Sequence, residues 1–134
     1  MIEITFTGEP VPAQRTRTAK GGHRYTPKKY KAYKSDLINH IENKYSHLKK
    51  LVPSKENKKE RTKYFKENRF YISLAVYRSK SYGDADNFLK AVQDALEQSG
   101  VIGNDSQIDD GDFRKRVDKN NPRIEFKLTK LGGK

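Results

Sequence analysis

One segment, residues 69–78 with the sequence RFYISLAVYR, most constrains the fold, because it is long and rich in aromatic and branched side chains. Phe70, Ile72, Leu74 and Val76 occupy every second position, which predicts a β-strand with one buried face. The apolar share of the whole chain is only 33%, so few other segments can contribute to a core. We therefore expect this strand to lie in the middle of a sheet.

The remaining elements follow from the same kinds of periodicity. Residues 2–7 (IEITFT) alternate apolar and polar side chains, which predicts another strand. Apolar residues three and four positions apart predict a long amphipathic helix over 28–50 and a shorter helix over 87–98. Two further strands are expected at 108–118 and 122–129.

The ends of the shorter helix have their own signals. Asp86 or its neighbour is expected to cap its start, and Gly100 is expected to stop it. The resulting order of strand, helix, strand, helix, strand, strand predicts an α+β fold with a mixed sheet covered by helices. A chain of 134 residues is expected to form a single small domain over 1–134.

Two segments lie outside this pattern. Residues 8–27 are rich in Gly, Pro and basic side chains, and we expect a long basic loop there. Residues 52–68 carry many charges and few apolar side chains, so a mobile basic connection and a helical extension both remain open. No segment has the length and composition of a transmembrane helix or a signal peptide, and we expect a soluble, unexported protein.

The charge of the chain favours a polyanionic partner. The 29 Lys and Arg exceed the 17 Asp and Glu by 12, which indicates nucleic acid first and an anionic membrane surface second. Residues 1–70 hold 18 basic and 7 acidic side chains, whereas residues 84–112 hold eight acidic side chains and a single Lys. Four of these acidic residues are interpreted as solvated surface: Glu97, Asp109, Asp110 and Asp112.

Several common chemistries are excluded by what the sequence lacks. Without Cys, the chain has no disulfide, no thiolate nucleophile and no Cys-ligated metal. Its three His show no metal-ligand spacing, and the sequence contains no P-loop, dinucleotide-binding or G-x-S-x-G motif. We expect no small-molecule cofactor.

A candidate site precedes the shorter helix, in the sequence GDADN. Asp84 and Asp86 are two residues apart, so in an extended segment their carboxylates point to the same side and suit a hard divalent ion such as Mg²⁺. Lys90 follows Asp86 by one helical turn, where it could contact a phosphate or form an ordinary i,i+4 ion pair. Helix capping combined with ion pairing remains open as the alternative to a metal site.

Asp105 is a possible third member of this group. The helix covers about 18 Å from Asp86 to its end, and the following seven residues can return about 23–25 Å. The chain is therefore long enough to bring Asp105 back to the pair, although its length does not require it to do so.

The basic segment is a second candidate surface. Its Lys and Arg are interleaved with Tyr25, Tyr30 and Tyr33, a mixture that neutralises phosphates and stacks on bases. Tyr30 and Tyr33 also fit the apolar stripe of the long helix, which favours core packing for them. The candidate DNA contacts are Arg15, Arg17, Lys20, Arg24, Lys28, Lys29 and Lys34.

Residues 84–108 carry a more specific pattern, with DADNFLKA, DAL, GVI and NDSQI in order. This pattern resembles the D-x-D-N-x-x-K-A, D-A-L and D-[SA]-Q motifs of the RusA family of Holliday-junction resolvases. The short first strand, the basic loop and the total length are also similar to that family. The resemblance implies a RusA-like fold and a metal-dependent endonuclease.

The resemblance also implies roles for individual residues. Asp84, Asp86 and Asp105 would bind Mg²⁺ or Mn²⁺, and Lys90 would be needed for cleavage. The family is dimeric and cuts four-way DNA junctions, so the resemblance implies a homodimer, a branched-DNA substrate and a role in recombination and repair. Because the family comes largely from bacteria and their prophages, it also implies a cytoplasmic protein encoded by a bacterium or prophage.

Two features depart from the family pattern. A basic residue commonly precedes the D-x-D motif, whereas this chain has Gly83 there and Lys80 three positions earlier. The segment 52–68 is also longer than the usual connection in the family.

Two other function classes remain open on the sequence alone. A non-catalytic nucleic-acid-binding module would use the carboxylates within the fold and would bind DNA without metal and without cutting it. An interaction domain whose acidic segment docks a basic partner would bind DNA weakly at physiological salt.

Overall fold

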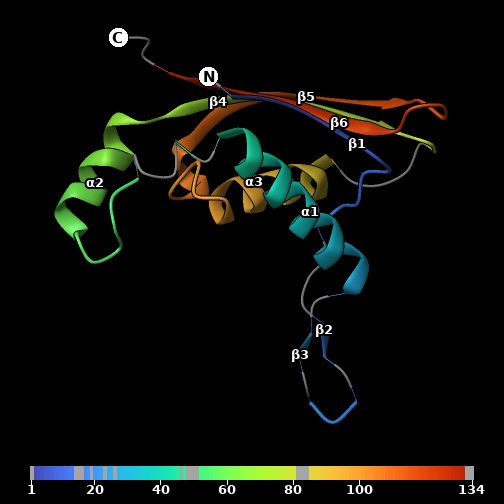
Figure 1. Ribbon diagram of the computed structural model, residues 1–134, viewed down its shortest axis with the longest axis horizontal. Helices are drawn as coiled ribbons and strands as arrows, with labels where there is room; N and C mark the ends of the chain where they lie inside the picture. The colour runs from blue at the N-terminus through green and yellow to red at the C-terminus, as the bar shows by residue number, and fades with distance from the viewer. Residues whose placement is uncertain are drawn as a thin grey trace.

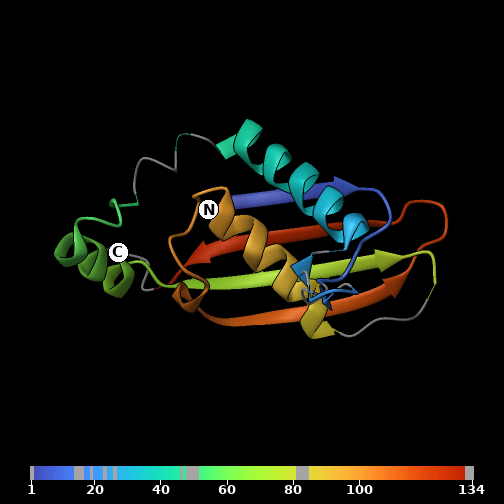
Figure 2. The ribbon, with the colours of Figure 1, turned by 90° about the horizontal axis from the view of Figure 1, so that it is seen from below.

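The computed structural model describes most of the chain, with the backbone alone at 17–18, 24–25 and 85–86; the described residues are 2–13, 17–18, 20–22, 24–25, 27–45, 47, 52–80 and 85–131. The main sheet has the strand order β1-β6-β4-β5. These strands are β1 (Ile2–Thr7), β6 (Arg123–Lys130), β4 (Phe70–Arg78) and β5 (Ile108–Val117). β6 is antiparallel to both β1 and β4, whereas β5 is parallel to β4 (Figure 2). The predicted mixed sheet is confirmed.

β4 lies inside the sheet, as its sequence predicts. Ile72, Leu74 and Val76 are all buried, at 2% exposure or less, and they alternate with half-buried residues that face the other way. β6 repeats this alternation on the same face with Ile124, Phe126 and Leu128. The two neighbouring strands thus form the sheet's contribution to the core.

Two helices cover this face of the sheet. α1 (Lys28–Tyr45) and α3 (Ala85–Gln98) lie on the same side in Figure 1. Leu37 and Ile41 of α1 and Phe88 and Leu96 of α3 are buried in the core that the helices share with the strands. In the described part of the chain, no helix covers the opposite face of the sheet (Figure 1).

The helix boundaries differ from the predicted ones. α1 ends at Tyr45, five residues earlier than expected, and Leu48 of the predicted apolar stripe lies outside the described residues. α3 begins at Ala85, so Asp86 lies in its first turn and is not its N-cap. The helix dipole favours a carboxylate in the first turn. Gly100 follows α3 with a φ of +80°, in the left-handed conformation that ends helices, as predicted.

Two elements are additional to the predicted order. Within residues 8–27, β2 (Arg17–Thr18) and β3 (Arg24–Tyr25) form a short antiparallel hairpin, which extends away from the main sheet in Figure 1. Within residues 52–68, the helical alternative is realised as α2 (Lys58–Glu67).

α2 is held by a few specific contacts, since it has no buried residue of its own. The Asn57 side chain accepts a hydrogen bond from the Glu60 N–H at 3.3 Å and so caps the helix. The Arg61 guanidinium donates to the carbonyl oxygens of Pro53, at 2.9 Å, and Gly103, at 3.1 Å. None of the described helices is long and apolar enough to cross a membrane.

Gly111 marks a close approach between β5 and β4. A Cβ at this position would collide with the carbonyl oxygen of Ile72 and lie 2.8 Å from its Cγ2 atom. A backbone oxygen cannot rotate away as a flexible side chain does. β5 therefore has to move for any larger residue to fit at position 111.

We expect Gly111→Ala to lower the free energy of unfolding by about 1–3 kcal/mol, because the added methyl group forces β5 away from β4. Urea denaturation followed by circular dichroism measures this change. Lys119→Ala, an exposed site in the turn after β5, is the control and should change stability by less than about 0.5 kcal/mol. Equal stability of Gly111→Ala and wild type would contradict the close approach.

Candidate active site and nucleic-acid interface

The amino-terminal end of α3 carries the candidate carboxylate pair. Asp86 lies in the first turn, and the structure describes its backbone. Asp84 precedes the helix by one residue and lies outside the described residues. Asp86 is thus located by the start of α3, which the surrounding packing fixes.

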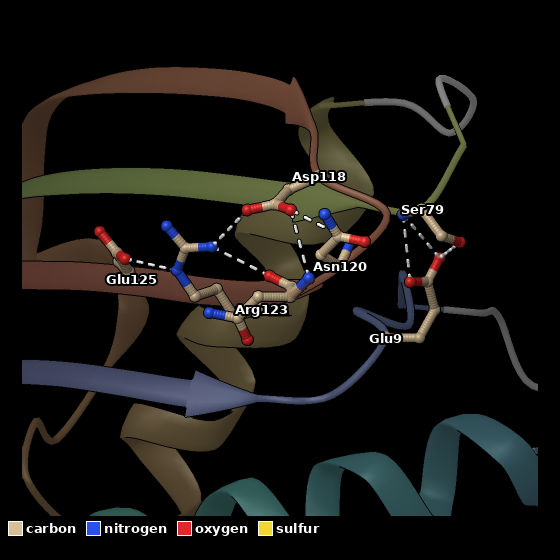
Figure 3. Close-up of polar contacts among 7 residues, drawn as sticks. Glu9, Ser79, Asp118, Asn120, Arg123 and Glu125 are labelled. Atoms are coloured by element: carbon tan, nitrogen blue, oxygen red, sulfur yellow. Dashed lines mark hydrogen bonds and ion pairs between the residues drawn. The ribbon is translucent and has the colours of Figure 1, made fainter.

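A buried ion pair lies beneath this end of α3. Arg78, the last residue of β4, is 4% exposed, and its Nε is 3.6 Å from the Glu9 Oε1 atom. Its guanidinium also lies 5.0 Å from the ring centroid of Phe88, in the first turns of α3. Glu9 accepts hydrogen bonds from the Ser79 N–H at 3.2 Å and from its hydroxyl at 2.9 Å (Figure 3). These contacts join the end of β4 to the segment after β1 and support the start of α3.

Sequence reasoning missed this ion pair, although a signal was present. Arg78 continues the two-residue alternation of Ile72, Leu74 and Val76, so it belongs to the buried face of β4. A charged side chain at an inward-facing position needs a partner of opposite charge, because burying an unpaired charge is costly. The acidic residue nearest to the end of β1 is Glu9, and it is that partner.

The segment that leads into the basic hairpin is fastened to the same end of α3. The Ala13 N–H donates to the Asn87 carbonyl oxygen at 2.9 Å. Val11 and Tyr30 form a small apolar cluster with Ala91 of α3. The segment before the basic hairpin and the start of α1 are therefore anchored to the first turns of α3.

Lys20, Lys28 and Lys29 are exposed, and Lys34 is half-buried. Lys20 lies in the turn of the hairpin, and Lys28 and Lys29 lie in the first turn of α1. The Lys34 ammonium lies 5.1 Å from the ring centroid of Tyr30. Of the other candidate DNA contacts, Arg15 lies outside the described residues, and Arg17 and Arg24 have only their backbone described.

Lys90 lies on α3 one turn after Asp86. Its side chain is 59% exposed, and its Nζ is 3.5 Å from the Asp94 Oδ1 atom. Asp94 also accepts a hydrogen bond from the Tyr30 hydroxyl at 3.0 Å, which links α1 to α3. Burial and this hydrogen bond raise the pKa of Tyr30, so its hydroxyl stays protonated and can donate to Asp94. Core packing is confirmed for Tyr30, which is 3% exposed.

Asp105 lies at the other end of α3, where the motif residues around it form a rigid turn. The Asn104 side chain accepts from the Ser106 N–H at 2.9 Å and caps the 3₁₀ turn η2 (Asp105–Gln107). Gln107 is fully buried, and its side-chain oxygen accepts from the N–H groups of Gly103 and Asn104 at 2.7 and 3.0 Å.

The amide of Gln107 completes this turn, since its Nε2 donates to the Asn68 carbonyl oxygen at 2.9 Å, just before β4. Half-buried Asp105 is thereby fixed next to the start of the sheet. The Gln of the motif has a structural role that the sequence analysis did not identify.

The structure does not bring Asp105 to Asp86 within one chain. Phe70 pairs with Ile108 and Arg78 with Val117, so β5 begins beside the start of β4, at the end of the sheet away from Arg78. The return of Asp105 that the chain length allows is not made. Among the residues whose side chains are described, no three His, Asp or Glu gather closely enough to hold a metal ion.

Two of the residues interpreted as solvated surface have specific partners. Asp109 forms an ion pair with Arg69, with a distance of 2.9 Å from Nε to Oδ2. Asp112 accepts hydrogen bonds from the hydroxyls of Tyr71, at 2.7 Å, and Ser73, at 2.8 Å. Hydrogen bonds to these partners lower the pKa values of both Asp109 and Asp112. Both carboxylates are thus held at the edge of the sheet.

A comparison with protein-family models matches residues 7–129 to the family described as endodeoxyribonuclease RusA. No match was found among curated proteins. The matched range includes the start of α3, Lys90, the turn that holds Asp105 and the whole basic segment. Because the match spans nearly the whole chain, the chain belongs to the RusA family, whose members are endodeoxyribonucleases that resolve Holliday junctions.

Proposed function

We propose that this chain is a metal-dependent, homodimeric endonuclease that resolves four-way DNA junctions by hydrolysing two phosphodiester bonds. The observation that supports this most directly is the 2.9 Å hydrogen bond from Ala13 to Asn87. It fastens the basic segment, which attracts DNA, to the start of α3, where Asp86 lies. Attraction of the substrate and a seat for a divalent ion are thus placed side by side.

The donor set at this point fits a hard divalent ion. Asp84 and Asp86 offer carboxylate oxygens, the ligands that Mg²⁺ and Mn²⁺ accept in proteins. When bound, such an ion supplies a Lewis acid that activates water and stabilises the charge of the leaving oxygen. Without it, the two carboxylates repel a DNA phosphate, so they can hold the substrate in a reactive position only when their charge is balanced.

Asp105 is the proposed third ligand, and we propose that the other chain supplies it, because the parallel pairing of β4 and β5 keeps Asp105 at the end of the sheet away from Asp86. Asp86 and the end of α3 lie about 18 Å apart along the helix axis, and Asp105 follows that end. A ligand to Mg²⁺ lies about 2.1 Å from the ion, so the two residues of one chain cannot share it. In a twofold dimer, Asp105 of each copy completes the site of the other copy, which gives two sites per dimer.

Lys90 is proposed to contact a phosphate or the leaving oxygen during cleavage. Its ammonium is exposed, lies one turn from Asp86 and is held by Asp94 at 3.5 Å. An exposed i,i+4 ion pair of this kind is weak, so a phosphate oxygen can replace Asp94 as the partner. Asp94 keeps the lysine on the correct side of α3 until DNA arrives.

DNA binding is assigned to the basic hairpin and the start of α1. Lys20, Lys28, Lys29 and Lys34 are proposed to contact phosphates, together with the arginines at positions 15, 17 and 24. Binding of this kind releases counterions and weakens as salt is added. Since these residues are distinct from the carboxylates, binding and cutting can be measured separately.

We expect Asp86→Asn to lower Mg²⁺-dependent cleavage of a labelled four-way junction by at least about 100-fold, because a metal ligand is lost. Junction binding should be unchanged or tighter, because a negative charge that repels phosphate is removed. Denaturing gels measure cleavage, and gel shifts in the presence of a chelator measure binding. Asp36→Asn on the exposed face of α1 is the matched control and should cleave normally.

Equal loss of binding and cleavage in Asp86→Asn would argue against the assignment of DNA binding and cleavage to separate residues. Tight binding by wild type without scission under Mg²⁺ or Mn²⁺ would argue against a metal-dependent nuclease.

Subunit complementation tests whether Asp105 comes from the second copy. Asp86→Asn and Asp105→Asn should each be inactive alone, whereas dimers that contain one chain of each have one intact site. Because random pairing makes half of the dimers mixed, co-refolding should restore about one quarter of the wild-type nicking rate. The products should be nicked on one strand. No recovery, with mixed dimers demonstrated by differential tags, would place all three carboxylates of each site in one chain.

Replacing Lys28 and Lys29 together by Ala should weaken junction binding and flatten its salt dependence. The slope of log K against log salt concentration is expected to fall by about 2, because each phosphate contact contributes about 0.9. Fluorescence anisotropy over a salt series measures this slope. Lys127→Ala with Lys130→Ala on β6, which removes the same charge elsewhere, should leave the slope unchanged, and an equal decrease in both double variants would refute the assignment.

A further inference from the structure

The two edges of the main sheet differ in how they are closed. At β1, the Tyr45 hydroxyl accepts from the Glu3 N–H at 2.9 Å and donates to the Glu3 carbonyl oxygen at 3.1 Å. The Lys44 ammonium donates to the same carbonyl oxygen at 3.0 Å. These side chains occupy the hydrogen-bonding groups that a neighbouring strand would use.

The β5 edge is covered only by side chains of β5 itself in the described part of the chain: the Gly111 N–H donates to the Asp110 carboxylate at 2.8 Å, and the Arg116 guanidinium donates to the Lys115 carbonyl oxygen at 3.1 Å. β5 is ten residues long, stands last in the strand order and pairs on one side with β4 (Figure 2). A long exposed edge is a template for another strand, and natural proteins usually block it with charged side chains, with Pro or with a covering element.

The charges on β5 change sign at its middle. The strand reads IDDGDFRKRV, with three acidic side chains before Phe113 and three basic side chains after it. An edge with this order is complementary to a copy of itself that runs in the opposite direction. An edge protected only against aggregation has no need of such an order.

The pleat places the relevant charges on one face. The register with β4 aligns Asp110 with Tyr71, and Asp112, Arg114 and Arg116 follow at alternate positions, all on the face that no described helix covers. Phe113 lies on the opposite face, where it packs against the core.

We propose that β5 pairs antiparallel with β5 of a second copy of this chain, about a twofold axis at Phe113, to form one continuous sheet of eight strands. This interface rests on the proposed function, since it specifies how the homodimer proposed there assembles. Asp112 of each copy lies opposite Arg114 of the other, and Asp110 lies opposite Arg116. The two Phe113 side chains meet at the axis.

Neighbouring registers are disfavoured by the same charges. In an antiparallel pair of strands, side chains that lie opposite each other point to the same face of the sheet. The twofold axis can therefore move only by whole residues, because any other shift would place a residue of the core face opposite a residue of the open face. Moving the axis by one residue places Asp112 opposite Asp112 in one direction and Arg114 opposite Arg114 in the other. Like charges directly opposite destabilise a pair of strands, which leaves Phe113 as the centre.

Two further observations support this arrangement. The hydrogen bonds from Tyr71 and Ser73 hold the Asp112 carboxylate on the open face and favour its charged form. Asp105 precedes β5, so in the proposed pairing it lies beyond Val117 of the other copy. Val117 is in register with Arg78, so Asp105 arrives at the end of the sheet that lies beside the start of α3.

Charge reversal at the edge tests the proposal. An acidic-edge variant (Arg114→Glu with Arg116→Glu) and a basic-edge variant (Asp110→Lys with Asp112→Lys) should each sediment with the mass of one chain. An equimolar mixture of the two should sediment with the mass of two chains, because every opposing pair is then of opposite charge. Lys58→Glu with Lys59→Glu on α2, which makes the same change in net charge as the acidic-edge variant, should remain dimeric like wild type.

A cross-link tests the register independently, because the chain contains no Cys. Phe113→Cys should form a disulfide-linked dimer on mild oxidation, since position 113 faces itself across the axis. Val117→Cys, a half-exposed site on the same strand, should not cross-link, because the two copies of position 117 lie eight residues apart in this register.

A wild-type chain that sediments as a monomer, or charge-reversed variants that stay dimeric without mixing, would overturn the proposal. Cross-linking through position 117 and not through 113 would also overturn it. A monomeric wild type would also refute the homodimer of the proposed function, whereas the other outcomes concern the β5 interface alone. Wild type that cleaves junctions while the edge variants remain dimeric refutes only this interface, whereas a β5-paired dimer that cuts no DNA with Mg²⁺ or Mn²⁺ refutes only the metal-dependent nuclease.

Discussion

A strand that pairs in parallel with the strand before it requires a connection that returns along the length of the sheet, and α3 makes that return between β4 and β5. The parallel pairing therefore separates the two acidic motifs. One motif precedes the helix, at the end of the sheet where β4 finishes, and the other follows it, beside the start of β4. The family pattern is continuous in sequence but divided in space, and in the proposed dimer two chains reunite its parts at one ion.

Some residues of the family motif are proposed to take part in the reaction, and others hold neighbouring groups in place. Asp94 links Tyr30 to Lys90, and Gln107 fixes the turn that presents Asp105. Both contact structural partners, so their conservative replacement would affect the placement of other groups before it affected the reaction itself. The Glu9 and Arg78 pair acts in the same way beneath the start of α3. A site built from short carboxylates depends on such supports, because a shift of about 1 Å is enough to spoil the geometry of a catalytic group.

Periodicity predicts local structure well and pairing direction poorly. β4 and its inward-facing residues were predictable because branched and aromatic side chains alternate there, and the stop of α3 was predictable from Gly100. The position of Asp105 was not, because chain length limits only how far a segment can reach and does not say whether the next strand runs parallel or antiparallel. The choice between a helix and a mobile connection at residues 52–68 stayed open for another reason, since the few anchors of α2, such as Arg61, bind backbone oxygens of other segments.

The division of the site between two chains has a consequence for how DNA is handled. The basic hairpin and the start of α1 belong to one chain, whereas in the proposed dimer the three carboxylates meet only across the two chains. A single chain can therefore bind DNA without holding a complete catalytic centre. Dimerisation through β5 then sets the distance and symmetry between the two centres, because a continuous sheet is stiff. The proposed dimer would thereby restrict cutting to substrates whose two strands can reach both centres at once, which is the geometry that a four-way junction offers.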